Sequence, residues 1–387
     1  MNAAELTSYI KREAAALGFT LSGVAPAVAP PGAARLDEWL AAGYAGQMHY
    51  LADRREAYGH PRHVLEGVRS VVMLAMEYRT AEPVLPQPGE GRISRYAWGS
   101  ADYHDLIRER LNQLASQLRE WAPGALARGV VDTAPLLERE FAQLAGLGWI
   151  GKHTLLINRD RGSWFFLSAL LTDIELQYDA PHETDHCGTC RACLDACPTD
   201  AFPQPYVLDA SRCISYLTIE LKDAVPAELR AGLGEWLFGC DVCQEVCPWN
   251  RHAREGEAPA EPGSAGASPS QVFSPRPDNN PLDLIPLFEL DDAAFRARFR
   301  HTPLWRPKRR GILRNAAIVL GNRTAPAALP ALVRGLNDDE PLVRGACAWA
   351  LGRFPQASAA EALRDRRETE PDAEVRGEID AALGKHN

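Results

Sequence analysis

The chain has 387 residues, of which 46% are hydrophobic and 24% are charged, and its formal net charge is −9. This composition is ordinary for a globular protein and excludes a mainly disordered chain, a collagen-like chain and a coiled coil. At about 150 residues per domain the length predicts two or three domains, and the negative charge argues against a protein that grips nucleic acid by bulk positive charge.

The apolar runs of the sequence are too short to cross a membrane. The longest, at 71–76 and 164–171, fall below the ~18 residues that a spanning helix needs. The N-terminal segment carries charges throughout, without the apolar core of a secretory signal or the paired arginines of a twin-arginine leader. We therefore expect a cytoplasmic protein with no membrane partner.

Residues 1–180 predict a mixed α/β domain in which helices cover a sheet. Apolar residues at helical spacing favour helices at 3–17, 105–121 and 136–147, the first stopped by Gly18 and the last by Gly148. Buried strands are expected at 71–75, 129–131, 155–158 and 164–172. The last two are expected to meet at the turn 159–162.

Eight of the nine cysteines lie in a cysteine-rich module that we expect at 181–251. In a reducing compartment, cysteines at short spacing are more often metal ligands than disulfides. The first run, Cys-x-x-Cys-x-x-Cys-x-x-x-Cys-Pro from Cys187 to Pro198, is the bacterial ferredoxin pattern. The second run, Cys-x-x-Cys-x-x-x-Cys-Pro, extends from Cys240 to Pro248, and Cys213 stands between the two.

Eight thiolates suffice for two [4Fe-4S] clusters. In two-cluster ferredoxins the fourth cysteine of each run serves the other cluster. Cluster one would then take Cys187, Cys190, Cys193 and Cys247, and cluster two would take Cys197, Cys213, Cys240 and Cys243. Zinc is the alternative, although zinc sites usually show two separated Cys-x-x-Cys pairs. The ninth cysteine, Cys347, is expected to be a buried packing residue.

Two clusters conduct single electrons but select no substrate. The chain has neither the Cys-x-x-x-Cys-x-x-Cys pattern of radical enzymes that use S-adenosylmethionine nor a Gly-x-Gly-x-x-Gly after a strand. The substrate site must therefore be of another kind, on this chain or on a partner.

The last third of the chain predicts a linker followed by helices. Residues 252–280 are rich in Pro, Ala, Gly and Ser and predict a low-complexity insertion or linker. In 281–387, the stretches 314–321, 342–352 and 374–384 share a recurring Leu-Gly, at a spacing of about 32 residues, which suggests a short HEAT-like repeat. An irregular helical domain is the alternative.

Four stretches, in order, together resemble the epoxyqueuosine reductase family, which is related to the cobalamin-dependent reductive dehalogenases. They are Ser-Arg-Tyr-Ala-Trp-Gly with Asp-Tyr-His (94–104), Val-Asp-Thr-Ala-Pro-Leu-Leu-Glu-Arg with Gly-Leu-Gly-Trp-Ile-Gly-Lys (131–152), the first cysteine run with Cys-Ile-Ser-Tyr-Leu (187–217), and Gly-Cys-Asp-Val-Cys-Gln-x-x-Cys-Pro (239–248). The resemblance covers nearly the whole chain except 252–280.

The resemblance implies an α+β protein that reduces the epoxide of epoxyqueuosine to an alkene, giving queuosine at the wobble position of tRNA. A nitroreductase-like domain (1–180) and the ferredoxin-like module would sandwich base-off cobalamin, and the HEAT-like repeats would complete a basic groove for the anticodon stem-loop. The modified base would have to be splayed out to reach a buried cobalt. We expect a monomer that receives electrons from an external low-potential donor.

Asp132 is the expected proton donor, because expelling the epoxide oxygen requires a proton on it. Burial beside an apolar cofactor face would raise the pKa of this carboxyl and keep the proton available. The alternative is that Asp132 caps the following helix. His104 is either close to this site or structural.

The resemblance also implies the contacts to cobalamin and tRNA. Each has a plainer alternative in core packing, backbone capping or solvation. The positions that align with cobalamin contacts are Arg55, Ser94, Asp132, Leu156, Leu167, Ser215, Asp241 and Val242. Lys222 aligns with a tRNA contact, and the segment 296–314, with seven arginines, one lysine and no acidic residue, favours phosphate contacts.

Two other functions stay open at this stage. A dehalogenase-like enzyme would use cobalamin on a small halogenated molecule, and the basic helical extension argues against it. A non-enzymatic electron carrier would need only the clusters.

Overall fold

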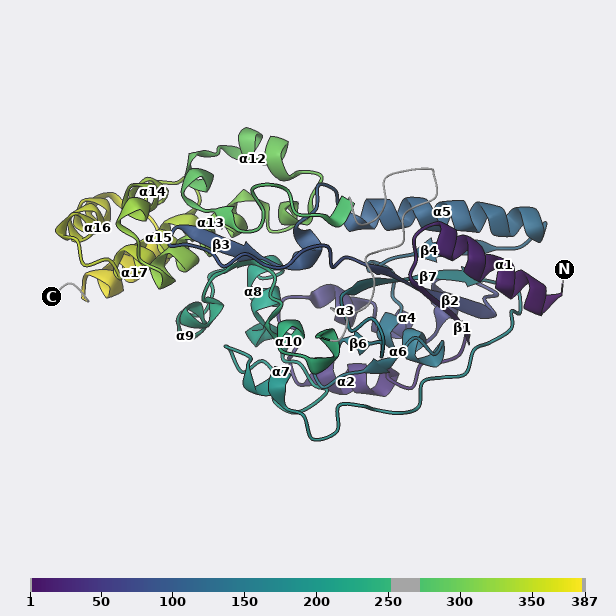
Figure 1. Ribbon diagram of the computed structural model, residues 1–387. Coiled ribbons are helices and arrows are strands. Elements are labelled where there is room, and N and C mark those ends of the chain that lie inside the picture. Colours follow the sequence, from purple (N-terminus) through teal and green to yellow (C-terminus); the bar gives the residue numbers. More distant parts are fainter. Residues whose placement is uncertain (1, 252–271, 385–387) are drawn as a thin grey trace.

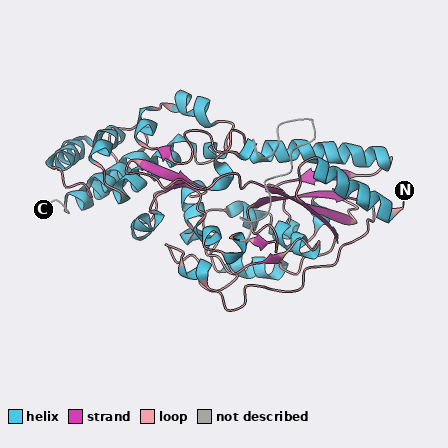
Figure 2. Ribbon diagram, viewed as in Figure 1, coloured by secondary structure: helices cyan, strands magenta, loops and turns pink. Residues whose placement is uncertain are grey.

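The computed structural model describes residues 2–251 and 272–384. The described N- and C-terminal ends lie at opposite ends of an elongated molecule (Figure 1). Most of the strands lie in the N-terminal half, whereas the C-terminal half is helical (Figure 2). Among the described residues no helix combines the length and the apolar character needed to cross a membrane.

The core of the N-terminal half is a four-stranded antiparallel sheet. Its order is β1-β2-β7-β4, with β1 at Leu21–Pro26, β2 at Ser70–Glu77, β7 at Phe165–Thr172 and β4 at Ala127–Val130. The two middle strands are apolar on both faces, because helices cover the sheet from both sides.

Successive residues of β2 point to opposite layers. Val72 and Leu74 join the core under α1 (Ala3–Ala16) and α5 (Tyr103–Trp121). Val71 and Met73 join the core under α6 (Glu138–Leu144). The short helices between β1 and β2 are α2 (Ala33–Ala41), α3 (His49–Asp53) and α4 (Arg55–Tyr58).

The expected meeting of strands 155–158 and 164–172 is wrong. β6 (Leu156–Ile157) pairs instead with β5 (Trp149–Ile150) in a separate two-stranded sheet. Both edges of β7 are already taken by β2 and β4, since its apolar residues place it in the middle of the main sheet. The turn between the two segments is closed only by a bridge between Asn158 and Gly162.

A small three-stranded sheet joins distant parts of the chain. β3 (Glu90–Ile93) pairs in parallel with β8 (Trp236–Phe238) and antiparallel with β9 (Leu282–Asp283). The cysteine-rich module contributes β8. Its helices are α7 (Ala192–Asp195), α8 (Ile214–Ile219), α9 (Ala227–Arg230) and α10 (Val242–Glu245).

The predicted linker differs from expectation where it is described. Residues 252–271 lie outside the described residues. Phe273, by contrast, is 1% exposed, and its ring centroid lies 5.3 Å from that of Phe166. Asn279 is buried and donates to the carbonyl oxygen of Trp98. Residues 272–280 are therefore packed against the core, anchored by Val272 and Phe273 at one end and by Asn279 at the other.

The C-terminal half is a stack of helices. The three recurring stretches fall on α13, α15 and α17, which pack in that order. A Cβ atom on Gly321 would lie 2.9 Å from Cα of Ala350, and one on Gly352 would lie 2.8 Å from Cα of Ala382. The recurring glycine therefore lets neighbouring helices approach closely. The helices are α12 (Asp292–Phe299), α13 (Lys308–Asn322), α14 (Leu329–Gly335), α15 (Pro341–Leu351), α16 (Ala357–Thr369) and α17 (Ala373–Leu383).

Candidate active site

Asp132 lies just beyond the end of β4, in a conformation that side chains rarely adopt. Its φ is 56°, in the left-handed region, and its carboxyl is 47% exposed. A non-glycine residue held there costs free energy, of the order of 1 kcal/mol, so the surrounding contacts must fix it. Its side chain does not cap the following helix α6, whose N-cap, Leu137, accepts no side-chain hydrogen bond.

His104 joins Asp132 to a second carboxylate. Nε2 of His104 lies 3.0 Å from Oδ2 of Asp132, and Nδ1 lies 2.7 Å from Oδ1 of Asp102. Asp102 is also the N-cap of α5 and accepts from the backbone N–H of His104 at 3.0 Å. The sequence Asp-Tyr-His at a helix start therefore orients the imidazole between two carboxylates.

The ring of Tyr103 stacks on the ring of Phe166 and on His104, with centroids 4.0 Å apart in both pairs. This packing fixes the plane in which His104 meets Asp132.

In this structure the pKa of Asp132 is lowered, whereas burial beside a cofactor face was expected to raise it. The hydrogen bond from His104 lowers the pKa of this carboxyl and outweighs its desolvation. Burial opposes the charged imidazole, but the hydrogen bonds to Asp102 and Asp132 prevail and raise the pKa of His104 to about 9. At neutral pH the proton therefore rests on His104, and Asp132 is ionised.

Two further groups surround Asp132. Glu138 accepts from the backbone N–H of Asp132 at 2.9 Å, and burial raises the pKa of Glu138 to about 8. Arg306 lies 3.7 Å from Asp132 and 2.8 Å from Glu220, so a residue of the C-terminal half reaches the site. Glu138 lies in the stretch 131–152 and Arg306 lies in the basic segment 296–314. The sequence alone predicts neither residue as a neighbour of Asp132.

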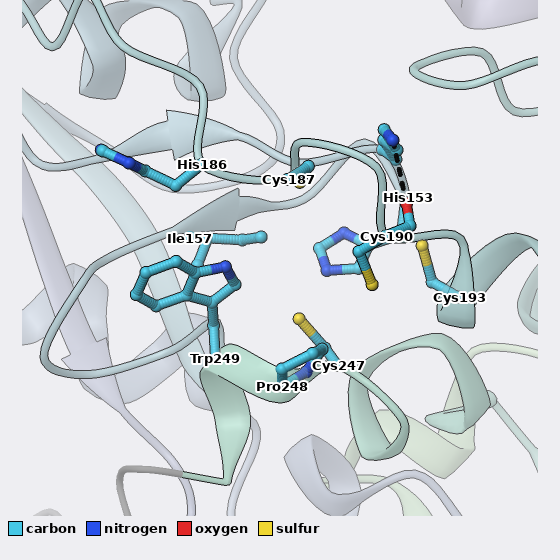
Figure 3. Close-up of a pocket in the computed structure, with 10 residues that line it drawn as sticks. His153, Ile157, His186, Cys187, Cys190, Cys193, Cys247, Pro248 and Trp249 are labelled. Carbon is cyan, nitrogen blue, oxygen red and sulfur yellow. Dashed lines mark hydrogen bonds between the residues drawn. The ribbon is translucent and has the colours of Figure 1, made fainter.

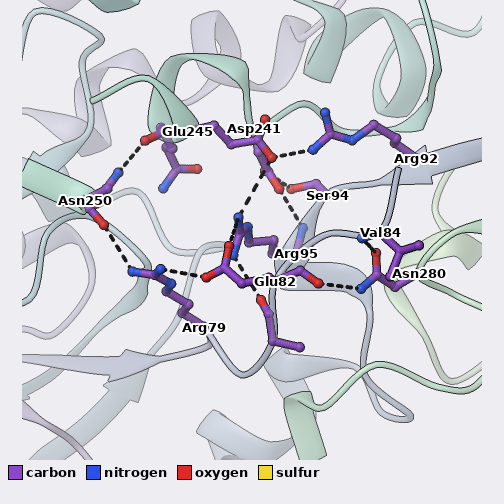
Figure 4. Close-up of polar contacts among 12 residues, drawn as sticks. Arg79, Glu82, Val84, Arg92, Ser94, Arg95, Asp241, Glu245, Asn250 and Asn280 are labelled. Atoms are coloured by element: carbon purple, nitrogen blue, oxygen red, sulfur yellow. Dashed lines mark hydrogen bonds and ion pairs between the residues drawn. The ribbon is translucent and has the colours of Figure 1, made fainter. Parts of the chain in front are cut away.

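Ser94 and Asp241, both predicted cobalamin contacts, bind each other instead of facing open space. The Ser94 hydroxyl donates to Asp241, which also accepts from the backbone N–H of Arg95 at 2.8 Å (Figure 4). Ser94 is 3% exposed and Asp241 is 1% exposed. Burial raises the pKa of Asp241 to about 6. This pair ties the cysteine loop of α10 to the N-terminal half.

Arg55, another predicted cobalamin contact, has an ion-pair partner at the surface. Its guanidinium is exposed and pairs with Asp37 on α2. The neighbouring Arg54 instead donates to the carbonyl oxygen of Thr133 at 3.1 Å, next to Asp132. A one-residue difference on a short helix decides which arginine reaches the site, and sequence alone does not resolve it.

The remaining predicted cobalamin contacts divide by exposure. Leu156 is 3% exposed and packs in the core beneath the sheet. Leu167, Ser215 and Val242 are partly exposed. These three offer two apolar surfaces and one hydroxyl, which is the chemistry that a corrin face and its rim amides require.

The four cysteines predicted for cluster one line one cavity of about 270 Å³. The sulfurs of Cys190, Cys193 and Cys247 surround this space together with the imidazole of His153 (Figure 3). Burial raises the pKa of Cys193 to about 11, and the neighbouring thiols Cys247 and Cys187 add to the shift. This cavity therefore has the four thiols that one [4Fe-4S] cluster needs on its wall, with Cys190 at the exposed side.

The four cysteines predicted for cluster two are all partly buried. Burial raises the pKa of Cys240 and of Cys243 well above that of an ordinary thiol. Charges on Cys213 and Cys197 also raise the pKa of Cys243, which indicates that these four thiols lie near one another as a second group. Cys193, from the first group, raises the pKa of Cys243 as well, which indicates that the two groups of thiols are neighbours.

The arginine-rich segment is only partly available to a ligand. Arg314 is 1% exposed and donates to the carbonyl oxygens of Leu217, Leu221 and Asp223 at 2.6–2.8 Å. This buried arginine fixes the loop that carries the exposed Lys222. Others in the segment also have partners, with Arg298 bound to Asp278 and Arg309 bound to Asp338, whereas Arg296, Arg300, Lys308 and Arg310 are exposed.

Comparisons with known proteins match this arrangement along the chain. A family model described as "Epoxyqueuosine reductase QueG, DUF1730" matches residues 59–133, a "4Fe-4S double cluster binding domain" matches 186–250, and "HEAT repeats" match 309–384. The chain is 43% identical over 359 residues to the epoxyqueuosine reductase of Pseudomonas aeruginosa, covering 90% of this chain and 95% of that protein. It is 37% identical over 353 residues to that of Escherichia coli K12, covering 90% and 89%.

Solved structures of epoxyqueuosine reductases superimpose over the whole chain. One is an epoxyqueuosine reductase with an epoxyqueuosine-modified tRNA-Tyr stem loop, with a TM-score of 0.89, 30% identity and full coverage of both chains. Another, from Bacillus subtilis, has an aspartate catalytic loop swung out of the active site, with the same TM-score, identity and coverage.

Proposed function

Because the chain belongs to the epoxyqueuosine reductase family and reduces epoxyqueuosine to queuosine in tRNA, we propose that Asp132 and His104 together deliver one of the two protons that this reaction takes up. Converting an epoxide to an alkene takes up two electrons and two protons and releases one water. The observation that carries the proposal is the hydrogen-bonded chain Asp102–His104–Asp132 at the end of β4.

The proton reaches the substrate through a relay. At neutral pH the imidazolium of His104 holds it 3.0 Å from Oδ2 of Asp132. As the carbon–oxygen bond breaks, the carboxylate of Asp132 takes the proton from His104 and passes it to the epoxide oxygen. Asp102 stabilises the charged imidazole until transfer, and Arg306 holds the carboxylate in position.

The two [4Fe-4S] clusters supply the electrons one at a time. We assign Cys187, Cys190, Cys193 and Cys247 to cluster one and Cys197, Cys213, Cys240 and Cys243 to cluster two. Cluster one, with the exposed Cys190, would receive electrons from an external low-potential donor. Cluster two would lie beside Asp241, which follows its ligand Cys240 in the chain, and would pass electrons to the substrate site.

Cobalamin is the cofactor that we assign to the site at Asp132. When bound, it supplies a cobalt that can be reduced to a low-valent, strongly nucleophilic state. Leu167 and Val242 would offer apolar contact and Ser215 a hydroxyl, because these side chains are partly exposed. Leu156, Ser94 and Asp241 would support this surface from beneath, and Arg54 replaces Arg55 in our assignment.

The substrate is tRNA, held by phosphate contacts. Lys222 and the exposed arginines Arg296, Arg300 and Arg310 would bind phosphates of the anticodon stem-loop. The wobble base would be turned out of its stack toward Asp132. We propose that the chain acts as a monomer in the cytoplasm, where its tRNA substrate resides.

The test is anaerobic turnover. The purified holoprotein would be incubated with a low-potential reductant and tRNA carrying epoxyqueuosine, and the nucleosides would be analysed by mass spectrometry. Loss of one oxygen from the modified base, dependent on added cobalamin, is expected. Unchanged nucleosides from protein with intact clusters and bound cobalamin would favour a dehalogenase-like reaction on a small molecule.

A further inference from the structure

His153 has a buried nitrogen whose partner is absent from the described part of the chain. The residue is 3% exposed, and its Nε2 atom makes no hydrogen bond within the described residues. It lines the same cavity as the cysteines of cluster one (Figure 3). A buried polar atom without a partner costs about 1–3 kcal/mol, so an unused donor at this place points to a ligand in the cavity.

The backbone determines where the ring carries its proton. The N–H of Leu155 donates to Nδ1 of His153 at 3.2 Å. A nitrogen that accepts a hydrogen bond carries no hydrogen, so the ring is neutral and its single N–H is at Nε2. The ring therefore presents a donor, not a lone pair, to the cavity, and it is not placed to be a metal ligand.

The neighbouring residue fixes the ring relative to the cysteine loop. Nζ of Lys152 donates to the carbonyl oxygens of Gly188 at 2.6 Å and Cys190 at 2.9 Å. Since His153 follows directly, the loop of cluster one and the imidazole are held by the same segment. Thr154, the next residue, has a φ of 67°, which turns the chain back toward β6.

We infer that the Nε2–H of His153 donates a hydrogen bond to a sulfur of cluster one, a thiolate or a bridging sulfide, and thereby raises the reduction potential of this cluster. Reduction adds negative charge to the cluster, and an N–H directed at sulfur stabilises that charge. His153 is thus a positioning residue for electron entry. The inference rests on the ligand assignment of cluster one made above.

The experiment is a redox titration of the holoprotein followed by electron paramagnetic resonance. His153→Leu keeps an apolar side chain of similar length but removes the donor. We expect the midpoint potential of one cluster to shift to a lower value while that of the other stays unchanged. His153→Gln, whose amide can donate, should recover part of the shift.

His186→Leu is the matched control. His186 lines the same cavity, but its ring is exposed and its Nε2 lies 3.0 Å from Oγ1 of Thr184. This variant should leave both potentials unchanged. Equal potentials in wild type and His153→Leu, or equal shifts in both Leu variants, would overturn the inference.

A measurement on the wild type does not depend on how the variants fold. With ¹⁵N-labelled histidine, pulsed resonance of the reduced protein should show a weak nitrogen coupling and an exchangeable proton on one cluster, both retained in His186→Leu. No coupling, or one as large as that of a coordinated imidazole, would contradict a hydrogen bond. Neither readout uses tRNA or cobalamin, so failure of the proposed reaction would be seen separately in the nucleoside assay.

Discussion

Nε2 of His104 lies 3.0 Å from Oδ2 of Asp132, and this contact puts the proton of the site on the imidazole and the negative charge on the carboxylate. The carboxylate keeps 47% of its side-chain surface exposed, whereas His104 keeps 17%. His104, which carries the proton, is thus largely enclosed, and only Asp132, which transfers the proton, is open to the substrate.

Asp132→Asn should abolish proton transfer while leaving the cofactors in place. The amide keeps the size of the carboxyl but cannot pass a proton from His104 to the epoxide oxygen. General acid catalysis contributes about 10²–10⁴-fold, so we expect a loss of that order in single-turnover rate. The rate is measured by nucleoside mass spectrometry. Asp105→Asn, on the exposed surface of α5, is the control. Wild-type turnover in the Asp132 variant would refute the role.

The pH dependence should report His104. The pKa of this imidazole is raised to about 9, so the proton is available below that value and is lost as pH rises through it. Single-turnover rate should therefore fall on the alkaline side, by about tenfold per pH unit once the group is mostly deprotonated. In His104→Gln this alkaline fall should disappear, with a low rate at all pH values. An identical profile in both proteins would place the proton elsewhere.

Cys190→Ser should remove one cluster and spare the other. Iron content would fall from about eight to about four per chain, since each cluster needs its four ligands. Cys347→Ser is the matched control, because Cys347 is buried among the C-terminal helices and belongs to neither predicted set of cluster ligands. Iron analysis and resonance spectra of the reduced proteins check both variants. Loss of all iron in Cys190→Ser would mean that the clusters assemble only together.

Two arginines of one helix should separate stability from tRNA affinity. Arg314→Ala leaves three carbonyl oxygens without their donor in the interior, and we expect a loss of about 3 kcal/mol in stability. Arg310→Ala, at an exposed position, should leave the thermal midpoint unchanged. It should weaken tRNA binding and reduce the slope of log affinity against log salt by about 0.7–0.9. Fluorimetric melting and binding at several salt concentrations distinguish the two.

The sequence predicts ligand patterns in this molecule much better than it predicts side-chain partners. Cysteine spacing and the four resembling stretches were enough for the family and for the iron–sulfur module, because covalent ligand patterns are written along the chain. The side-chain partners were harder. The order of residues does not show that His104 forms a hydrogen bond with Asp132 and lowers the pKa of its carboxyl. Nor does it show that Arg54, and not Arg55, donates to the carbonyl oxygen of Thr133.

The partners of β7 could not be predicted from the sequence for a related reason. The run 164–172 reads as a strand, and the turn before it suggested a hairpin. Its neighbours are determined by burial on both faces, which requires β2 on one side and β4 on the other. Such a choice depends on segments about 40 to 100 residues away. Local patterns do not contain it.

The pairing of β3 with both β8 and β9 has a consequence for how the protein is made. A ribosome completes β3 about 140 residues before β8 and nearly 190 residues before β9. Until residue 283 has left the exit tunnel, one edge of this strand has no partner. The iron–sulfur ligands, which end at Cys247, all emerge earlier. During synthesis there is therefore an interval in which all eight cysteine ligands have left the ribosome but β9 has not yet paired with β3. The clusters can be inserted in this interval, before the fold is complete.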